Sequence, residues 1–328
     1  MAGIGSFISP GRSLETAIKR ARLADELGFD SVYTTHIAAR DSLIVLAAYA
    51  ATTNRVKVGT GVMPIFSRTP VATAQAAATV DELSGGRMVL GLGVSHKVTV
   101  ENWFGTTIDK PVTQMRDYAQ IVRAILTGAD PSEGEYFKTN FHFMGYEARA
   151  DLPIYVAALS PNMLRLAGEI ADGAMLWLCN PAYISEVVVP EVTKGREKAG
   201  KTLEGFDIVA AVPSGLTDER DTAYAAMRGE LVTYFSLPFY RTMIERSGYG
   251  DDVKAFDEAI ESGDVEKAKA GISDRFLEAL TAIGSEDEVR AGVERYREAG
   301  ATSPCVGGIP GGDIEATLAA VAEMLYGP

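Results

Sequence analysis

The stretch VKVGTGVMPIFSRTPVATAQAAATVDELSGGRMVLGLG, residues 56–93, decides the fold class. Residues 56–62 are rich in β-branched residues and predict a strand. Pro70 opens an alanine-rich segment that is typical of a helix and ends at Ser84-Gly85-Gly86. Residues 88–92 form a second short apolar run. This order predicts two parallel strands joined by a helix, because parallel strands need a crossover connection between them.

The same unit recurs along the whole chain. We expect further strands at the following residues: 4–8, 31–35, 154–158, 174–178, 206–212 and 302–306. Eight strand–helix units in 328 residues favour α/β architecture as a closed (β/α)8 TIM barrel over an open doubly wound sheet.

Two long insertions interrupt this rhythm, one after the fourth strand (93–153) and one after the seventh (213–301). We expect a single barrel domain over residues 1–328, with a helical insertion at about 213–285. The acidic stretch 251–266 is interpreted as a solvated helical face, and a lid or a dimer contact is the alternative.

Composition excludes several classes of protein. Hydrophobic residues make up 47% and charged residues 23%, which excludes a disordered chain. The net charge of −13 argues against nucleic-acid binding, which needs clustered cations. Only two cysteines are present, without metal-ligand spacing, so we expect no metal and a reducing compartment, the cytoplasm. No apolar run is long enough to predict a membrane span.

Several common catalytic motifs are absent. The chain has no Gly-x-Ser-x-Gly elbow, no His-Glu-x-x-His, no Cys-x-x-Cys and no Walker phosphate loop. Gly91-Leu92-Gly93 begins like a dinucleotide fingerprint, but His96 stands where the third glycine belongs. A Rossmann-type cofactor site is therefore not expected.

Two of the three histidines follow predicted strands directly. His36 comes after the second strand and His96 after the fourth, and in a barrel those ends meet at one mouth. A histidine is a natural proton donor near neutral pH, although each could equally bond backbone at the start of a loop. His142 lies in an aromatic segment and is interpreted as structural.

Small residues mark two further places. Glycines at 59, 61, 91 and 93 interrupt the third and fourth strands, which indicates close approach of a ligand or of another backbone segment, and tight packing of the barrel interior is the alternative. Ser160-Pro161 follows the fifth strand and opens a helix whose amides could hold a phosphate, although an ordinary capped helix has the same sequence.

Three segments resemble the bacterial luciferase-like superfamily: GFDSVYTTHIAARD (28–41), VGTGVMPIFSRTPVATAQAAATVDELSGGRMVLGLGVSH (58–96) and PIYVAALSPNMLRLAGEIADGAMLW (153–177). The run GVSHKVTVE (93–101) is most similar to the branch that uses the deazaflavin coenzyme F420. The resemblance implies a TIM barrel that binds F420 at its mouth, acts on a small-molecule substrate and forms a homodimer.

The resemblance also implies roles for individual residues. His36 is the catalytic residue that faces the reactive side of the ring system, and Gly61–Val62 is a non-prolyl cis peptide against its back. Ser95, His96 and Thr99 hold the coenzyme's side chain, and residues 157–162 lie near its phosphate. The implied coenzyme-binding residues are Thr35, His36, Gly61, Val62, Gly93, Val94, Ser95, His96, Thr99, Ala157, Ala158, Leu159, Ser160, Pro161 and Asn162.

Two departures from the family pattern indicate the direction of the reaction. Members that oxidise sugar phosphates carry acids where this chain has Thr35 and His96, which argues for a reductase that passes hydride to a small organic acceptor. The alternatives are an FMN-dependent monooxygenase of the same superfamily and a barrel without catalysis. Arg40, Arg68 and Lys97 are the cations available to a polyanionic coenzyme, or else solvated surface charges.

Overall fold

The computed structural model describes residues 3–131 and 133–326. In that part of the chain, parallel strands form a closed barrel. In chain order the barrel strands are β1 (Gly5–Phe7), β2 (Ser31–Thr34), β3 (Lys57–Thr60), β5 (Met88–Gly93), β6 (Ile154–Ala157), β7 (Gly173–Leu176), β8 (Asp207–Leu216) and β10 (Ser303–Gly308). Each pairs with the next, and β10 pairs with both β8 and β1, which closes the ring. The predicted (β/α)8 barrel is confirmed.

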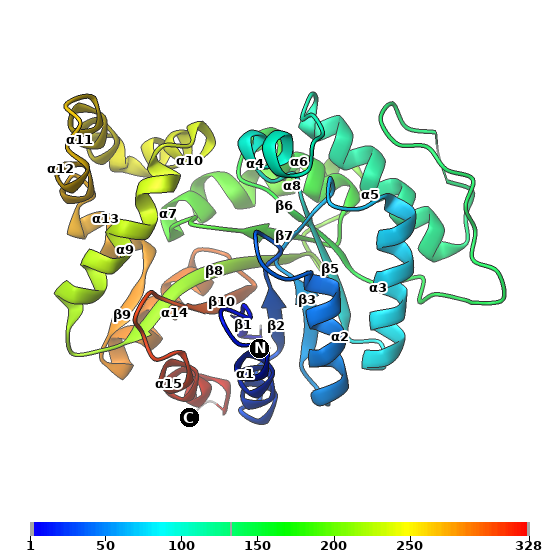
Figure 1. The fold of residues 1–328 in the computed structure, drawn as a ribbon, viewed down its shortest axis with the longest axis horizontal. Helices are drawn as coiled ribbons and strands as arrows, with labels where there is room; N and C mark the ends of the chain where they lie inside the picture. The colour runs from blue at the N-terminus through cyan, green and yellow to red at the C-terminus, as the bar shows by residue number, and fades with distance from the viewer. Residues whose placement is uncertain (1–2, 132, 327–328) are drawn as a thin grey trace.

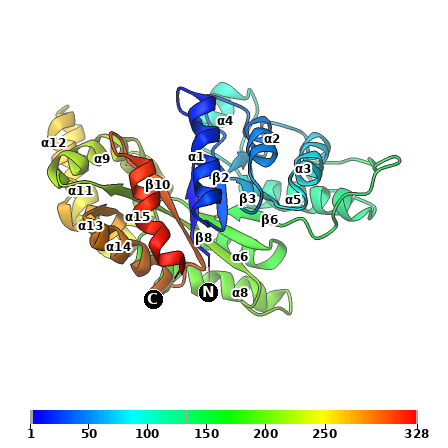
Figure 2. The ribbon, with the colours of Figure 1, turned by 90° about the horizontal axis from the view of Figure 1, so that it is seen from below.

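Helices surround this barrel (Figures 1 and 2). They are α1 (Leu14–Glu26), α2 (Ser42–Thr52), α3 (Pro70–Ser84), α5 (Pro111–Thr127), α6 (Pro161–Ile170), α8 (Val189–Lys198), α14 (Glu286–Glu298) and α15 (Ile314–Tyr326). Figure 2 shows α15 beside α1, so the first and last helices pack together. Polar side chains cap two of these helices: Ser13 caps α1, and Ser285 with Glu288 forms a capping box on α14.

The segment after β5 contains one ordinary barrel helix. α5 packs against α3 and α6, so it occupies the place of a barrel helix. The additional parts are α4 (Lys97–Trp103) at the mouth and the irregular residues 128–131 and 133–153, which belong to the green loop that projects at the right of Figure 1. A two-residue strand, β4 (Met63–Pro64), precedes α3 and pairs in parallel with the last two residues of β5.

The segment after β8 forms a helical group at the left of Figure 1. Its elements are α9 (Arg220–Phe235), α10 (Pro238–Ile244), η2 (Glu245–Tyr249), α11 (Gly250–Glu261), α12 (Val265–Ala270), α13 (Asp274–Leu280) and the strand β9 (Ala282–Gly284). The seventh strand was predicted to end at residue 212, which was wrong. β8 continues to Leu216, because Ser214–Leu216 pair with β9 and extend the strand past the barrel.

Side chains fill the barrel interior. Tyr33, Val89, Tyr155 and Met175 are buried there, with Phe7 and Val62 packed against them from the mouth side. The barrel is therefore a packed core that carries its site at one end, as is general for this fold. None of the described helices combines the length and the apolar character needed to cross a lipid bilayer.

Candidate active site at the mouth of the barrel

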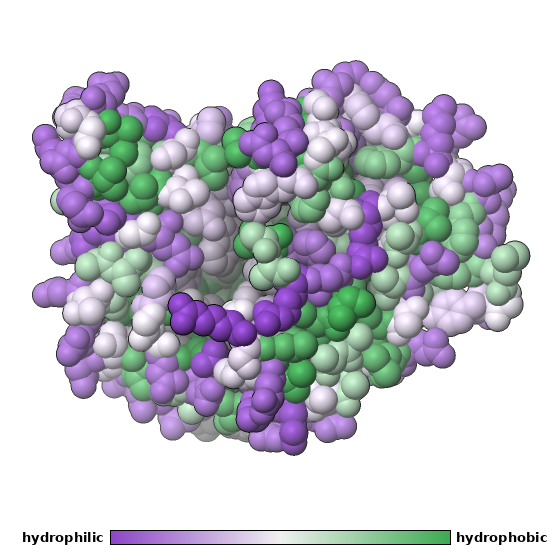
Figure 3. Space-filling model, in the orientation of Figure 1, coloured by the Kyte–Doolittle hydropathy of each residue, from purple (hydrophilic) through white to green (hydrophobic). Residues whose placement is uncertain are grey.

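The carboxyl ends of β2, β3, β5 and β6, called the mouth below, bring the predicted site residues together. These strands are neighbours in the barrel. Thr35 and His36 follow β2, Gly61 and Val62 follow β3, and the Val94–His96 loop follows β5. Figure 3 shows this face hollowed between the region over α9 and α10 and the loops that follow β1 and β2.

His36 is held by the first residue of α2. The backbone N–H of Ser42 donates to Nδ1 of His36 at 3.3 Å, and the Ser42 hydroxyl lies 3.1 Å from the same nitrogen. Nδ1 is therefore an acceptor, and the proton of the neutral ring resides on Nε2. Thr35 beside it bonds to the hydroxyl of Ser9 at 2.9 Å, which joins this loop to the end of β1.

Burial favours the neutral ring of His36. It lowers the pKa of His36; of the two nearby charges, the carboxylate of Asp41 raises that pKa, and the cation of Arg68 lowers it by less. Asp41 caps α2 by accepting from the backbone N–H groups of Leu43 and Ile44, and it pairs with Arg68. Arg68 is therefore tied to Asp41 rather than free to bind an anion.

The Gly61–Val62 peptide bond is cis, as the resemblance implies. The Thr60 hydroxyl takes the place of ladder hydrogen bonds here: it donates to the Gly91 carbonyl at 2.7 Å and accepts from the Gly91 N–H at 2.8 Å. Residues 61 and 62 thereby leave the ladder between β3 and β5.

Glycines make room for this bulge. A Cβ on Gly93 would lie 2.6 Å from Cγ2 of Val62, and one on Gly91 would lie 2.1 Å from the carbonyl oxygen of Thr60. A Cβ on Gly61 would lie 2.4 Å from the Phe7 ring. The structure therefore supports close approach of another backbone segment at Gly91 and tight packing against side chains at Gly61 and Gly93.

The loop after β5 has an unusual backbone. Ser95 has φ of 59°, a left-handed conformation that is uncommon for a residue other than glycine. His96 follows at the start of α4 without a capping hydrogen bond, and burial lowers its pKa. Thr99 lies half-buried on α4. His96 and His36 are thus two neutral imidazoles at one mouth.

Residues 157–162 form the end of β6 and the start of α6. The hydroxyl of Ser160 accepts from the Met163 N–H at 3.4 Å, with Pro161 at the first helical position. Tyr183 donates to the Leu159 carbonyl at 2.8 Å. Ala158 is buried and Asn162 is exposed. The helix start is an ordinary capped one that also faces the mouth.

The sequence interpretation missed a row of rings that crosses the mouth from β2 to α4, called the aromatic row below. It consists of Tyr33, Phe7, Trp177, Tyr234, Tyr240 and His96. Successive ring centroids lie 5.5, 6.4, 6.2, 4.9 and 5.8 Å apart. These separations are typical of packed aromatic pairs.

The aromatic row joins the insertion to the barrel. Trp177 directly follows β7, and Leu178 after it has φ of 57°. Position at a strand end was a signal that could have identified Trp177. No local signal identified Tyr234 on α9 or Tyr240 on α10, because only the tertiary fold places the insertion over the mouth.

The predicted cations differ in their availability. Arg40 donates to the carbonyls of Gly11 at 2.8 Å and Arg12 at 3.3 Å, so it braces the loop after β1. Lys97 is exposed and lies 3.8 Å from Glu101 within the same helix. Lys97 is therefore the least constrained of the three.

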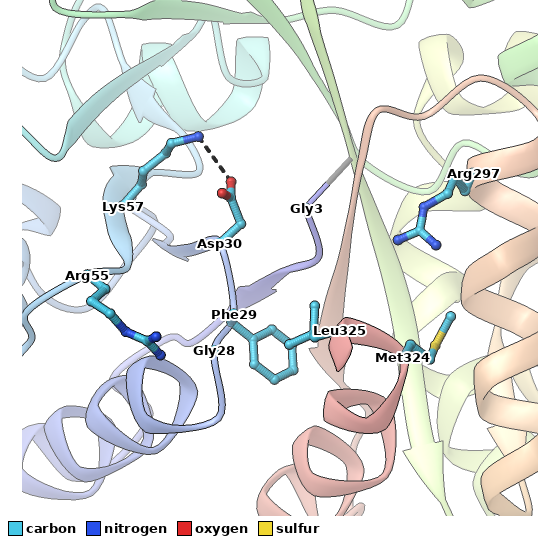
Figure 4. A pocket seen from close by; sticks show the side chains of 9 residues that line it. All are labelled: Gly3, Gly28, Phe29, Asp30, Arg55, Lys57, Arg297, Met324 and Leu325. Atoms are coloured by element: carbon cyan, nitrogen blue, oxygen red, sulfur yellow. Dashed lines mark hydrogen bonds and ion pairs between the residues drawn. The ribbon is translucent and has the colours of Figure 1, made fainter. Parts of the chain in front are cut away.

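A cavity of about 310 Å³ lies at the opposite, amino-terminal end of the strands (Figure 4). Its cations have partners: Lys57 pairs with Asp30 at 3.1 Å, and Arg55 donates to the Asp25 carbonyl at 2.7 Å. Barrel enzymes use the other end, and the predicted residues gather there. This cavity is therefore separate from the candidate site.

Comparisons with known proteins agree with this fold. The family model described as luciferase-like monooxygenase matches residues 1–303. The chain is 32% identical to the 5,10-methylenetetrahydromethanopterin reductase of Archaeoglobus fulgidus, over 93% of this chain and 92% of that protein. It is 30% identical to the enzyme of the same name from Methanolobus tindarius, over 94% of both chains.

A solved structure is similar over the whole chain. It is the coenzyme F420-dependent tetrahydromethanopterin reductase of Methanopyrus kandleri, with a TM-score of 0.81 and 27% identity over 98% of this chain and 97% of that one.

Proposed function

Because this chain belongs to the luciferase-like monooxygenase family, we propose that it is a coenzyme F420-dependent oxidoreductase that works as a reductase. The acceptor is a small organic molecule with an activated C=C, C=N or nitro group. The observation that carries the proposal is the pairing of a neutral His36 with the Gly61–Val62 bulge on adjacent strands. Relatives of 27–32% identity whose names specify reductases, one of them F420-dependent, support it.

The residues of the mouth fit a flat tricyclic ring. Val62 leaves the strand ladder and offers an apolar surface, and the aromatic row adds further ring faces at the mouth. Nε1 of Trp177 is buried, and no described residue accepts a hydrogen bond of normal geometry from it. A donor left unpaired in an apolar site is stabilised by a ligand acceptor.

We assign the coenzyme to the residues that the sequence nominated. The loop of Ser95, His96 and Thr99 and the segment from Ala157 to Asn162 would hold its side chain and phosphate. Thr35, His36, Gly61, Val62, Gly93 and Val94 would surround the ring system. The exposed Lys97 would meet the negative charge of the coenzyme.

When bound, reduced F420 supplies the hydride, from ring carbon C5. The protein positions the coenzyme and the acceptor, excludes water and supplies a proton. His36 offers Nε2–H to the atom of the acceptor that becomes basic, and Ser42 holds the ring in that tautomer. The aromatic row limits the access of water to the same space.

Coenzyme binding tests the proposal directly. Purified protein is titrated with F420 and, separately, with FMN, and then mixed with reduced F420 and a panel of acceptors. We expect micromolar binding of F420, weak binding of FMN and oxidation of reduced F420 by at least one acceptor class. Tight FMN binding with oxygen consumption would identify the monooxygenase instead, and binding of neither coenzyme would identify a barrel without this chemistry.

We also propose that the protein is a cytoplasmic homodimer. The two cysteines are buried and free, as expected in a reducing compartment. The adjacent helices α2 and α3 carry exposed apolar side chains, Ile44 (67% exposed) and Leu83 (51% exposed). Light scattering should give twice the chain mass for the native protein and a lower mass for I44E. A native mass equal to one chain would contradict the dimer.

A further inference from the structure

Glu230 lies on α9 next to the aromatic row. It stands one helical turn before Tyr234, so the two side chains share a face of the helix. The ring of Tyr234 packs against Trp177 from the barrel and against Tyr240 from α10. Glu230 therefore belongs to the wall of the mouth that the insertion supplies.

The carboxylate of Glu230 has no cationic partner in residues 3–131 and 133–326. The two arginines of α9 are engaged elsewhere, Arg220 with Glu288 and Arg228 with Asp274. Solvent reaches Glu230, yet enough protein surrounds it that burial raises the pKa of its carboxyl. A side chain on the wall of a hollow is expected to be reached by solvent and yet to have lost part of its hydration.

A neighbouring group completes the arrangement. Nε1 of Trp177 is a buried donor that lies near the Tyr234 hydroxyl and makes no hydrogen bond of normal geometry. The wall thus presents a carboxylate acceptor, an unpaired N–H donor and the faces of aromatic rings. A partly dehydrated carboxylate gains most from a ligand that brings positive charge or N–H donors, and it repels anions.

We infer that Glu230 forms a substrate subsite for a planar group that is cationic or carries N–H donors, with Trp177 and Tyr234 packing against its ring. The inference deepens the proposed function, since it names the class of acceptor that the reductase takes. It also separates the mouth into two sides. Lys97, the least constrained of the predicted cations, lies at the start of α4 after β5, which suits a polyanionic coenzyme, and Glu230 lies on the side of the insertion.

The native tryptophans allow a binding test that needs neither coenzyme nor turnover. The chain has two, and Trp103 lies exposed on α4. In a W103F background, Trp177 is the only tryptophan and reports on the subsite by fluorescence. The full-length protein is titrated with benzamidine, a planar cation with N–H donors, and with benzoate and benzyl alcohol as anionic and neutral analogues.

We expect benzamidine to quench Trp177 saturably, and E230Q to raise its dissociation constant about tenfold or more, because a charge-assisted hydrogen bond is lost. The matched control is E219Q, an exposed acid of the same helix region, which should change nothing. Equal binding of benzoate, or benzamidine binding that E230Q leaves unchanged, would overturn the inference. Failure of F420 to bind would instead overturn the proposed function and leave this titration intact.

Discussion

The backbone N–H of Ser42 donates to Nδ1 of His36, with 3.3 Å between the two nitrogen atoms. This contact makes the start of α2 part of the candidate site. A backbone donor carries its proton at any pH near neutrality, so the contact selects the tautomer in which Nε2 holds the ring proton. The same geometry disfavours the imidazolium form, in which Nδ1 would also be a donor.

Replacing His36 with alanine should abolish most of the activity without unfolding the protein. The side chain is half-buried at the mouth, and positioned general acids contribute about 10²–10⁴-fold to rate. Single-turnover oxidation of reduced F420 by an accepted substrate measures the loss. H142A is the matched control, because His142 lies near Asp130 in the irregular loop. Equal rates in H36A and the native enzyme would exclude the proton-donor role.

Ser42→Ala should reduce kcat by about 2- to 10-fold with little change in KM, since a net hydrogen bond of about 0.5–1.5 kcal/mol is removed. The backbone N–H remains, so the tautomer is kept and only the orientation of the ring loosens. The pH profile of kcat separates this role from a purely structural one: its acidic limb should move. A profile that matches the native one at reduced kcat would argue for a packing effect alone.

Gly93→Ala should weaken coenzyme binding and stability together. The new Cβ would lie 2.6 Å from Cγ2 of Val62 and would displace the bulge. Overpacking of this kind costs about 1–3 kcal/mol in the free energy of unfolding. Denaturant unfolding and F420 titration measure the two effects.

Gly229→Ala is the control for that substitution. A Cβ at position 229 on α9 meets nothing within 4 Å, so this variant should be about 0.5–1 kcal/mol more stable and bind F420 normally. If G93A binds F420 as tightly as the native protein, Val62 does not support the ring.

Stability should fall on mild acidification. The pKa values of His36 and His96 are lowered, mainly by burial, so the unfolded chain binds protons more readily than the folded one. The contribution of the two histidines to the free energy of unfolding is fully present above the ordinary histidine pKa of about 6.5. It is lost as the pH falls from there through their lowered pKa values. The raised pKa of Glu230 has the opposite effect at lower pH, because the folded protein then binds that proton more readily than the unfolded chain and gains stability.

Denaturant unfolding between about pH 5 and 7.5 measures this slope. The double variant H36Q/H96Q should have a flatter dependence of unfolding free energy on pH than the native protein. Identical slopes in the native protein and in the double variant would contradict the assignment of the effect to the mouth.

The fold class and the strand ends were predictable because they rest on local patterns. Buried parallel strands are short and continuously apolar. Pro70 marks a helix start because it has no N–H that needs a partner, and Ser285 marks one because its hydroxyl accepts from the Glu288 N–H. Once the barrel was inferred, topology alone required the segments after β2, β3, β5 and β6 to converge. The end of β8 was misplaced because its last residues pair with β9, which lies far along the chain.

The sequence by itself determined the barrel, the place of His36 and His96 at the mouth, and the family pattern around Gly61 and Val62. Only the tertiary structure decided which residues line the rest of the mouth. The contact between Trp177 and Tyr234 joins residues 57 positions apart, and it depends on how the insertion packs against the barrel. Periodicity and capping act within a few residues, so they specify elements and their ends. The partners of a side chain across the mouth depend on how whole elements pack, which no local pattern encodes.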